Sequence, residues 1–164
     1  LQEFSTKAGF IHVRRTWQEL LDEALLYLTN DLLSYKIVVQ RNKSEEPNIP
    51  QLVVDPNEIT EVLVTLISLI ISRFEHYGSI LWIETQVRDN KTLITNIAGS
   101  DNIAGVEIPR KSVNELFGEG KSYSPYQFSL EVVRELVAND YGGKITLHEN
   151  DANLRLTLEI PIER

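Results

Sequence analysis

Residues 55–74, DPNEITEVLVTLISLIISRF, decide the fold of this chain. The stretch opens on Asp55, a good N-cap residue, with Pro56 at the first helical position. Glu58 follows three residues after the cap, which is the spacing of a capping box. Large apolar residues predominate over residues 59–71, too many for a helix with one wet face. The sequence therefore predicts a buried central helix.

The polar residues of this helix recur at helical spacing and share one narrow stripe: Glu61, Thr65, Ser68 and Ser72. Two interpretations stay open for this polar seam. It is a relic of a ligand cleft, or it packs on backbone or is exposed at the edge of the sheet. The helix is too short, and carries Glu61 too centrally, to cross a membrane.

Periodicity and turn signals place the other elements around this helix. The sequence predicts helices over residues 16–33, 110–117 and 125–138, the last capped by Ser124. It predicts strands over residues 11–15 (at a sheet edge), 35–41 and 51–54. Two hairpins follow, residues 80–88 with 91–97 around an Asp89-Asn90 turn, and residues 144–149 with 154–160 after a helix end at Gly142-Gly143.

This order of elements predicts an α/β two-layer sandwich, a mixed sheet with helices on one face. We assign residues 16–164 to this single domain. Residues 1–15 are interpreted as a stub, with residues 1–10 the end of an upstream helix followed by a linker. The chain has 164 residues, enough for one sizeable core.

Composition excludes several classes of function. A net charge of −8 argues against nucleic acid as a partner, because phosphate contacts need clustered Lys and Arg. The chain has no cysteine, hence no disulfide framework and no thiolate chemistry. Its three histidines, His12, His76 and His148, are scattered without metal-ligand spacing, so no metal site is predicted.

Four segments in order, DPNEITEVLVTLI, IPRKSVNELF, SLEVVRELV and GGKITL, resemble the ATP-binding domain of sensor histidine kinases. The resemblance covers residues 16–163, and the preceding LQEFSTKAG resembles the end of that family's dimerisation helix. It implies a histidine-kinase-like ATPase fold, a cytoplasmic location, and a homodimer formed by an upstream helical hairpin. It also implies a response regulator or another signalling protein as partner, and a membrane contact only through segments outside this chain.

The resemblance also shows where the nucleotide contacts of the family have changed. The family's central helix carries two asparagines, four residues apart, that hold the magnesium ion and the phosphates. These positions fall at Thr65 and Leu69 here. Mg²⁺ takes oxygen ligands in near-octahedral geometry, and leucine offers none.

The family's next motif is an Asp-x-Gly-x-Gly run whose aspartate accepts a hydrogen bond from the adenine amino group. Its aspartate and two glycines correspond to Ile103, Gly105 and Glu107 in this chain. A shifted alignment would offer Asp101 or Asn96 as the substitute acceptor.

The third motif is a glycine-rich run at a helix start, where bare amides approach phosphate. Residues 125–130, PYQFSL, stand there, including Gln127 and Ser129. We expect this helix start to be capped by Ser124 and Gln127 and closed to an anion. Three residues of the short preceding loop, Gly118, Gly120 and Lys121, could still contact phosphate.

No histidine stands in the family's phosphoacceptor context, so no catalytic residue is predicted. The preferred hypothesis is a pseudo-kinase of two-component signalling that has lost the ability to bind ATP and needs no cofactor. It would act as a regulatory, protein-interaction or phosphotransfer-adaptor module. One alternative is a divergent but active histidine kinase domain that binds ATP and Mg²⁺. Another is a domain that binds a different small ligand in the remodelled cleft.

Overall fold

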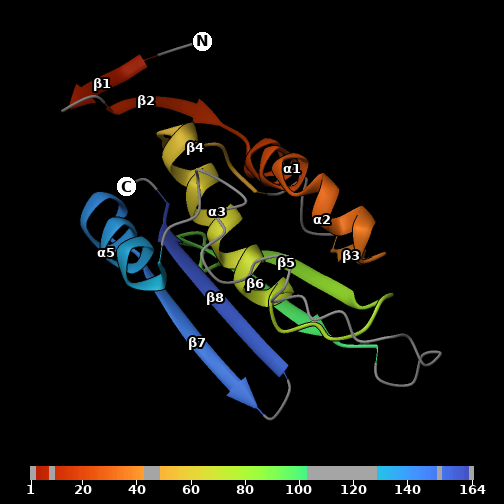
Figure 1. Ribbon diagram of the computed structural model, residues 1–164. Helices are drawn as coiled ribbons and strands as arrows, with labels where there is room; N and C mark the ends of the chain where they lie inside the picture. The colour runs from red at the N-terminus through yellow and green to blue at the C-terminus, as the bar shows by residue number, and fades with distance from the viewer. Residues whose placement is uncertain (1–2, 8–9, 43–48, 103–128, 151–152, 163–164) are drawn as a thin grey trace.

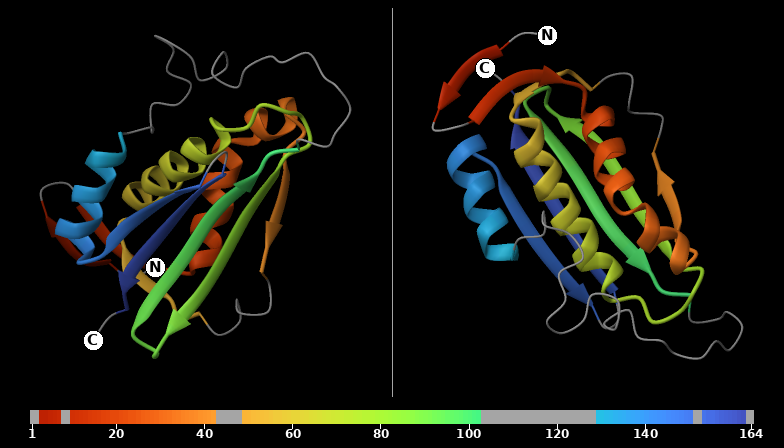
Figure 2. Two further views of the ribbon diagram at one scale, coloured as in Figure 1. Left: turned by 90° about the horizontal axis from the view of Figure 1, so that it is seen from below. Right: turned by 45° about the horizontal axis from the view of Figure 1, so that its top comes forward.

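The computed structural model describes residues 3–7, 10–42, 49–102, 129–150 and 153–162. Helices cover one face of a five-stranded sheet, which makes two layers (Figures 1 and 2). The helices are α1 (Trp17–Tyr27), α2 (Thr29–Ser34), α3 (Pro56–Ile71) and α5 (Leu130–Tyr141). The strands are β1 (Glu3–Lys7), β2 (Phe10–Arg15), β3 (Val38–Arg41), β4 (Leu52–Val54), β5 (Ile80–Arg88), β6 (Thr92–Ser100), β7 (Lys144–Asn150) and β8 (Asn153–Pro161).

Helix α3 is the predicted central helix. The Asp55 carboxylate accepts hydrogen bonds from the amides of Asn57 and Glu58, and Pro56 occupies the first turn. Twelve of its sixteen residues are buried, from Glu58 in the first turn to Ile71 at the end. The helix packs on α1, α5, β2, β6 and β8, so it lies at the centre of the core.

The main sheet has the strand order β3-β5-β6-β8-β7. Strand β3 pairs with β5 in parallel and the other neighbours are antiparallel, which confirms the predicted mixed sheet. Side chains alternate between its two faces. Leu81 and Ile83 of β5, and Leu93 and Ile97 of β6, are buried beneath the helices.

The N-terminal strands form a second sheet of order β1-β2-β4, which the sequence did not predict. Residues 3–7 are a strand, so the expectation of a helical end over residues 1–10 is wrong there. The predicted strand at 11–15 exists as β2, but it pairs on both sides, with β1 and with β4, and is not an edge. Pairing with distant β4 gives these residues partners that local sequence does not reveal.

Several predicted boundaries also shift. The helix expected over residues 16–33 is interrupted at Leu28, where α1 ends and α2 begins. The strand expected from residue 35 begins only at Val38, and β6 continues to Ser100. Helix α5 starts at Leu130, not after Ser124. The helix predicted at 110–117 and the Ser124 cap lie outside the described residues.

The two predicted turns are confirmed. Asp89 and Asn90 adopt φ values of 56° and 57° between β5 and β6, as a tight two-residue hairpin turn requires. Gly142 ends α5 with a left-handed φ of 66°. In the part of the chain that the structure describes, no helix has the length and apolar character needed to cross a membrane.

Candidate functional site

The polar seam of α3 is largely buried. Thr65 is 2% exposed, and Leu69, one turn later, is half-buried against the hydrophobic core. The Ser68 hydroxyl is buried and has no hydrogen-bond partner among the described residues, while the Ser72 hydroxyl donates to the Leu69 carbonyl at 2.7 Å. At the two positions that the resemblance assigns to magnesium and phosphate, the helix thus offers one hydroxyl and one hydrocarbon side chain.

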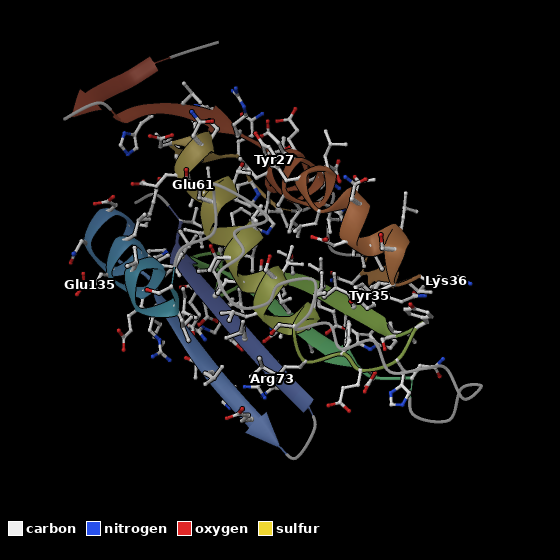
Figure 3. The ribbon with its side chains drawn as sticks, viewed as in Figure 1. Tyr27, Tyr35, Lys36, Glu61, Arg73 and Glu135 are labelled. Carbon is white, nitrogen blue, oxygen red and sulfur yellow. The ribbon has the colours of Figure 1, made fainter. Side chains whose placement is uncertain are left out.

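Glu61 is the carboxyl group of this seam, one turn before Thr65 (Figure 3). Its side chain is half-buried, and burial, followed by repulsion from Asp55, raises its pKa. Among the described residues, no group of three or more His, Asp or Glu side chains could hold a metal ion. The described part of the seam therefore does not present the oxygen ligands that Mg²⁺ requires.

Both carboxylate oxygens of Asp101 contact polar groups of residues 75–79. Its Oδ1 accepts from the amides of Glu75 and His76, each at 3.1 Å, and from the Ser79 hydroxyl at 2.8 Å. Its Oδ2 lies 3.0 Å from Nδ1 of His76. The side chain is only 8% exposed. Since an ionised carboxylate has about four acceptor sites, little capacity is left for a ligand.

Asn96 lies on the other side of the sheet from α3. In β6 the residues on the helix side are Leu93, Thr95 and Ile97, and Asn96 alternates with them. Its register partners are Glu84 on β5 and Thr157 on β8, and its Oδ1 accepts from the Thr157 hydroxyl at 2.6 Å. The structure therefore does not bring Asn96 together with Thr65 and Leu69.

The start of α5 is capped by Ser129. Its side chain accepts a hydrogen bond from the amide of Val132 at 3.2 Å. This cap lies five residues after Ser124, the serine that the sequence suggested, and the predicted closure by Ser124 and Gln127 lies outside the described residues. The other predicted site residues lie outside the described part of the chain: Ile103, Gly105, Glu107, Gly118, Gly120, Lys121 and Gln127.

A cavity of ≈ 420 Å³ lies at the opposite end of α5, beside its last turn. Asp140, Tyr141 and Gly142 form one wall, and His12 of β2 forms part of another. Sequence reasoning missed this place because its walls come from four segments far apart in the chain. They are His12, Leu52–Val54, Asp140–Gly142 and Ile160–Pro161.

A scan against protein-family models found no match, and a search of curated proteins found none. Solved structures do match. The catalytic domain of the histidine kinase ThkA superposes with a TM-score of 0.66 at 17% identity, over 92% of this chain and 95% of that domain. A second ThkA structure, in complex with the response regulator TrrA, gives 0.68 at 17% identity, over 97% of this chain and 44% of that one.

The histidine kinase AdeS from Acinetobacter baumannii also matches, with a TM-score of 0.62 at 19% identity, over 93% of this chain and 68% of that one. The element order, the mixed sheet and the helical layer define an α+β sandwich. The comparisons make the fold more specific: it is the fold of histidine kinase catalytic domains, and nearly the whole chain takes part in it.

Proposed function

We propose that this domain is a pseudo-kinase module of two-component signalling, which does not bind ATP with Mg²⁺ and acts through protein contacts. Support for two-component signalling comes from the fold, which is shared with histidine kinase catalytic domains. Support for a response regulator as partner comes from the complex that ThkA forms with TrrA.

One observation carries the proposed loss of nucleotide binding: the Asp101 carboxylate is already engaged in hydrogen bonds within the domain. An active but divergent site would need this carboxylate, or Asn96, to accept a hydrogen bond from adenine. Asp101 instead holds the turn of residues 75–79, and Asn96 faces away from α3. Leu69 adds to this, because it has no atom that can bind a cation or a phosphate group.

The expected loss of affinity is large. A hydrogen bond to a charged group contributes about 1.5–3 kcal/mol. Two missing contacts would therefore cost roughly 3–6 kcal/mol, and about 1.4 kcal/mol corresponds to a tenfold change in affinity. The affinity of a micromolar nucleotide site would fall by roughly a hundredfold to ten-thousandfold.

Titration of ATP with Mg²⁺ into the domain, followed by calorimetry and by thermal shift, tests the proposal. We expect no heat of binding and no change in melting temperature at millimolar nucleotide. A catalytic domain that binds nucleotide should be titrated in parallel as the positive control. Micromolar, magnesium-dependent binding would overturn the pseudo-kinase proposal and favour the active kinase. Asp101→Ala would then show whether this side chain recognises adenine.

The partner is tested separately. Purified response regulators of the same organism, presented to the immobilised domain, should include one that binds in the absence of nucleotide. We expect its affinity to be the same with and without ATP and Mg²⁺. An affinity that rises with nucleotide would contradict a module that signals without ATP.

A further inference from the structure

Helices α1 and α2 carry large apolar side chains on their exposed side. Leu26 near the end of α1 and Leu33 near the end of α2 are each 72% exposed, and no other large hydrophobic side chain of the described residues is more exposed. Tyr27, beside Leu26, is 47% exposed (Figure 3). Single exposed apolar residues are ordinary on a protein surface, whereas a cluster of them marks an interaction site.

The geometry of the two helices brings these residues together. The Leu32 amide donates to the Leu28 carbonyl at 2.9 Å, so helical hydrogen bonding continues across the interruption between α1 and α2. Leu26 and Leu33 are seven residues apart, which is about two helical turns, and residues at that spacing lie on the same side of a helix. Leu28, between them, is buried in the core. We call Leu26, Tyr27 and Leu33 the apolar patch.

The apolar patch lies at the side of the helical layer. Helix α3 lies between α1 and α5 in each view, so α1 and α2 form the outermost part of this layer (Figures 1 and 2). On its inner side α1 packs against α3. The outer side of α1 and α2 is therefore available to another molecule.

The same two helices are acidic. Residues 17–34 contain no lysine or arginine and four carboxyl groups, those of Glu19, Asp22, Glu23 and Asp31. Asp22 forms an ion pair with Arg41 at 2.6 Å, and the other three have no ion pair with a described residue. Asp22 and Glu23 precede Leu26 by about one turn, so these carboxylates lie in line with the apolar patch.

We propose that the outer side of α1 and α2 is a docking site for a basic amphipathic helix of a partner protein. Apolar side chains of that helix contact the apolar patch, and its lysine or arginine side chains lie against Asp22 and Glu23. The patch extends over about two turns, the length that residues at i, i+3 or i+4, and i+7 of a partner helix cover. The inference rests on the proposed function only in that the domain acts through protein contacts.

Charge distinguishes this occupant from the others. A second copy of the domain brings the same acidic helices to the interface, and each copy carries a net charge of −8, so like charges oppose the association. An anionic lipid surface is repelled in the same way. A basic helix gains both apolar contact and charge complementarity.

Chemical-shift mapping on the nitrogen-15-labelled domain tests the docking site. The probe is a synthetic helical peptide of about 18 residues, long enough to form a helix, with leucines along one side and lysines at one end. We expect saturable shifts at the amides of the apolar patch, and an affinity that falls with added salt because ions screen the charges. A second peptide with glutamate in place of each lysine should bind at least tenfold more weakly. Equal binding of the two peptides, or no shift at the patch, would overturn the proposal.

Leucine variants test the apolar contact. Leu26→Ser and Leu33→Ser should each weaken binding of the lysine peptide by about tenfold or more, because each removes a side chain that is buried on docking. Val132→Ser is the matched control, since Val132 is a half-exposed apolar residue on α5. It should bind the peptide like the wild type. All three residues are on the surface, so circular dichroism should show unchanged folding.

Charge variants test the position of the basic groups. Glu23→Lys should weaken binding of the lysine peptide by several-fold, whereas Glu135→Lys, at an exposed glutamate of α5, should leave it nearly unchanged. The two substitutions change the net charge of the domain equally. The same loss in both variants would show that the peptide responds only to net charge, and would contradict a docking site on α1 and α2.

Sedimentation velocity and vesicle flotation examine the other occupants. We expect the chain to be a monomer and not to bind phosphatidylcholine vesicles. A dimer that Leu26→Ser dissociates would assign the patch to a second copy, and vesicle binding that Leu26→Ser abolishes would assign it to a lipid surface. Either result overturns the proposal. The ATP titration fails independently: nucleotide binding together with patch-dependent peptide binding would overturn the pseudo-kinase and leave the docking site in place.

Discussion

Gly143 illustrates how one residue can be fixed by a neighbour distant in sequence. A Cβ atom at this position would lie 2.1 Å from the backbone oxygen of Glu159 on β8. The obstacle is backbone, so a side-chain rotation cannot relieve it. We expect Gly143→Ala to lower the free energy of unfolding by about 1–3 kcal/mol or more, as in other overpacked sites. Urea denaturation measures this loss, and Gln86→Ala on the exposed face of β5 should change stability by no more than about 0.5 kcal/mol.

At this scale the sequence predicts what a residue does locally and misses what it does across the fold. Asp55 caps α3 as the spacing indicated, and Gly142 ends α5. Glu58 also has the capping-box spacing, but its hydrogen-bond partner Tyr141 is 83 residues away. A shifted alignment offered Asp101 as a substitute acceptor for adenine, whereas its side chain accepts hydrogen bonds from the 75–79 turn, which the pairing of β5 with β6 brings beside it.

At the scale of elements, Asp101 joins the end of α3 to the end of β6. Its hydrogen bonds order the turn that leads from α3 into β5. We expect Asp101→Ala to destabilise the domain by about 2–4 kcal/mol at pH 7, since hydrogen bonds to a charged group are lost together. Glu135→Ala, on the exposed side of α5, should be nearly neutral in the same thermal denaturation.

The pH dependence of this variant checks the cause. Burial raises the pKa of Asp101, but hydrogen bonds from His76, Ser79 and the Glu75 amide outweigh it and hold the pKa below its ordinary value near 3.8. The stabilisation is therefore present above that pH and disappears as pH falls through the lowered pKa. The difference between Asp101→Ala and wild type should shrink in acid, and a difference that stays constant to pH 3 would contradict an electrostatic origin.

Two observed element boundaries differ from the predicted ones because the local backbone conformation interrupts a periodic apolar pattern. The Thr29 hydroxyl donates to the carbonyl of Leu26 at 2.8 Å, next to the interruption between α1 and α2. Lys36 adopts a φ of 53°, which no strand tolerates, so β3 starts after it although the apolar run begins earlier. Apolar periodicity carries no signal for either event.

For the whole molecule, the order of helices and strands predicted the sandwich, but not its division into two sheets. Alternation shows which face of a strand is buried and gives no partner strand. The partners of β2 are β1, close by in the sequence, and β4, which follows two helices and β3. The positions of a nucleotide site could be assigned only through the resemblance to sensor histidine kinases, because neither the composition of this chain nor the spacing of its residues identifies such a site.

Helix α3 packs on β2 of the smaller sheet and on β6 and β8 of the larger one, so we expect the two sheets to unfold as one cooperative unit. Leu63 lies in this helix and is fully buried, whereas Leu33 of α2 is 72% exposed. We expect Leu63→Ala to cost about 2–5 kcal/mol and Leu33→Ala about 0.5 kcal/mol or less. In urea, circular dichroism and tryptophan fluorescence should report a single transition for both variants, because Trp17 of α1 belongs to the same core. Two separated transitions in Leu63→Ala would show that the sheets unfold independently and that α3 does not couple them.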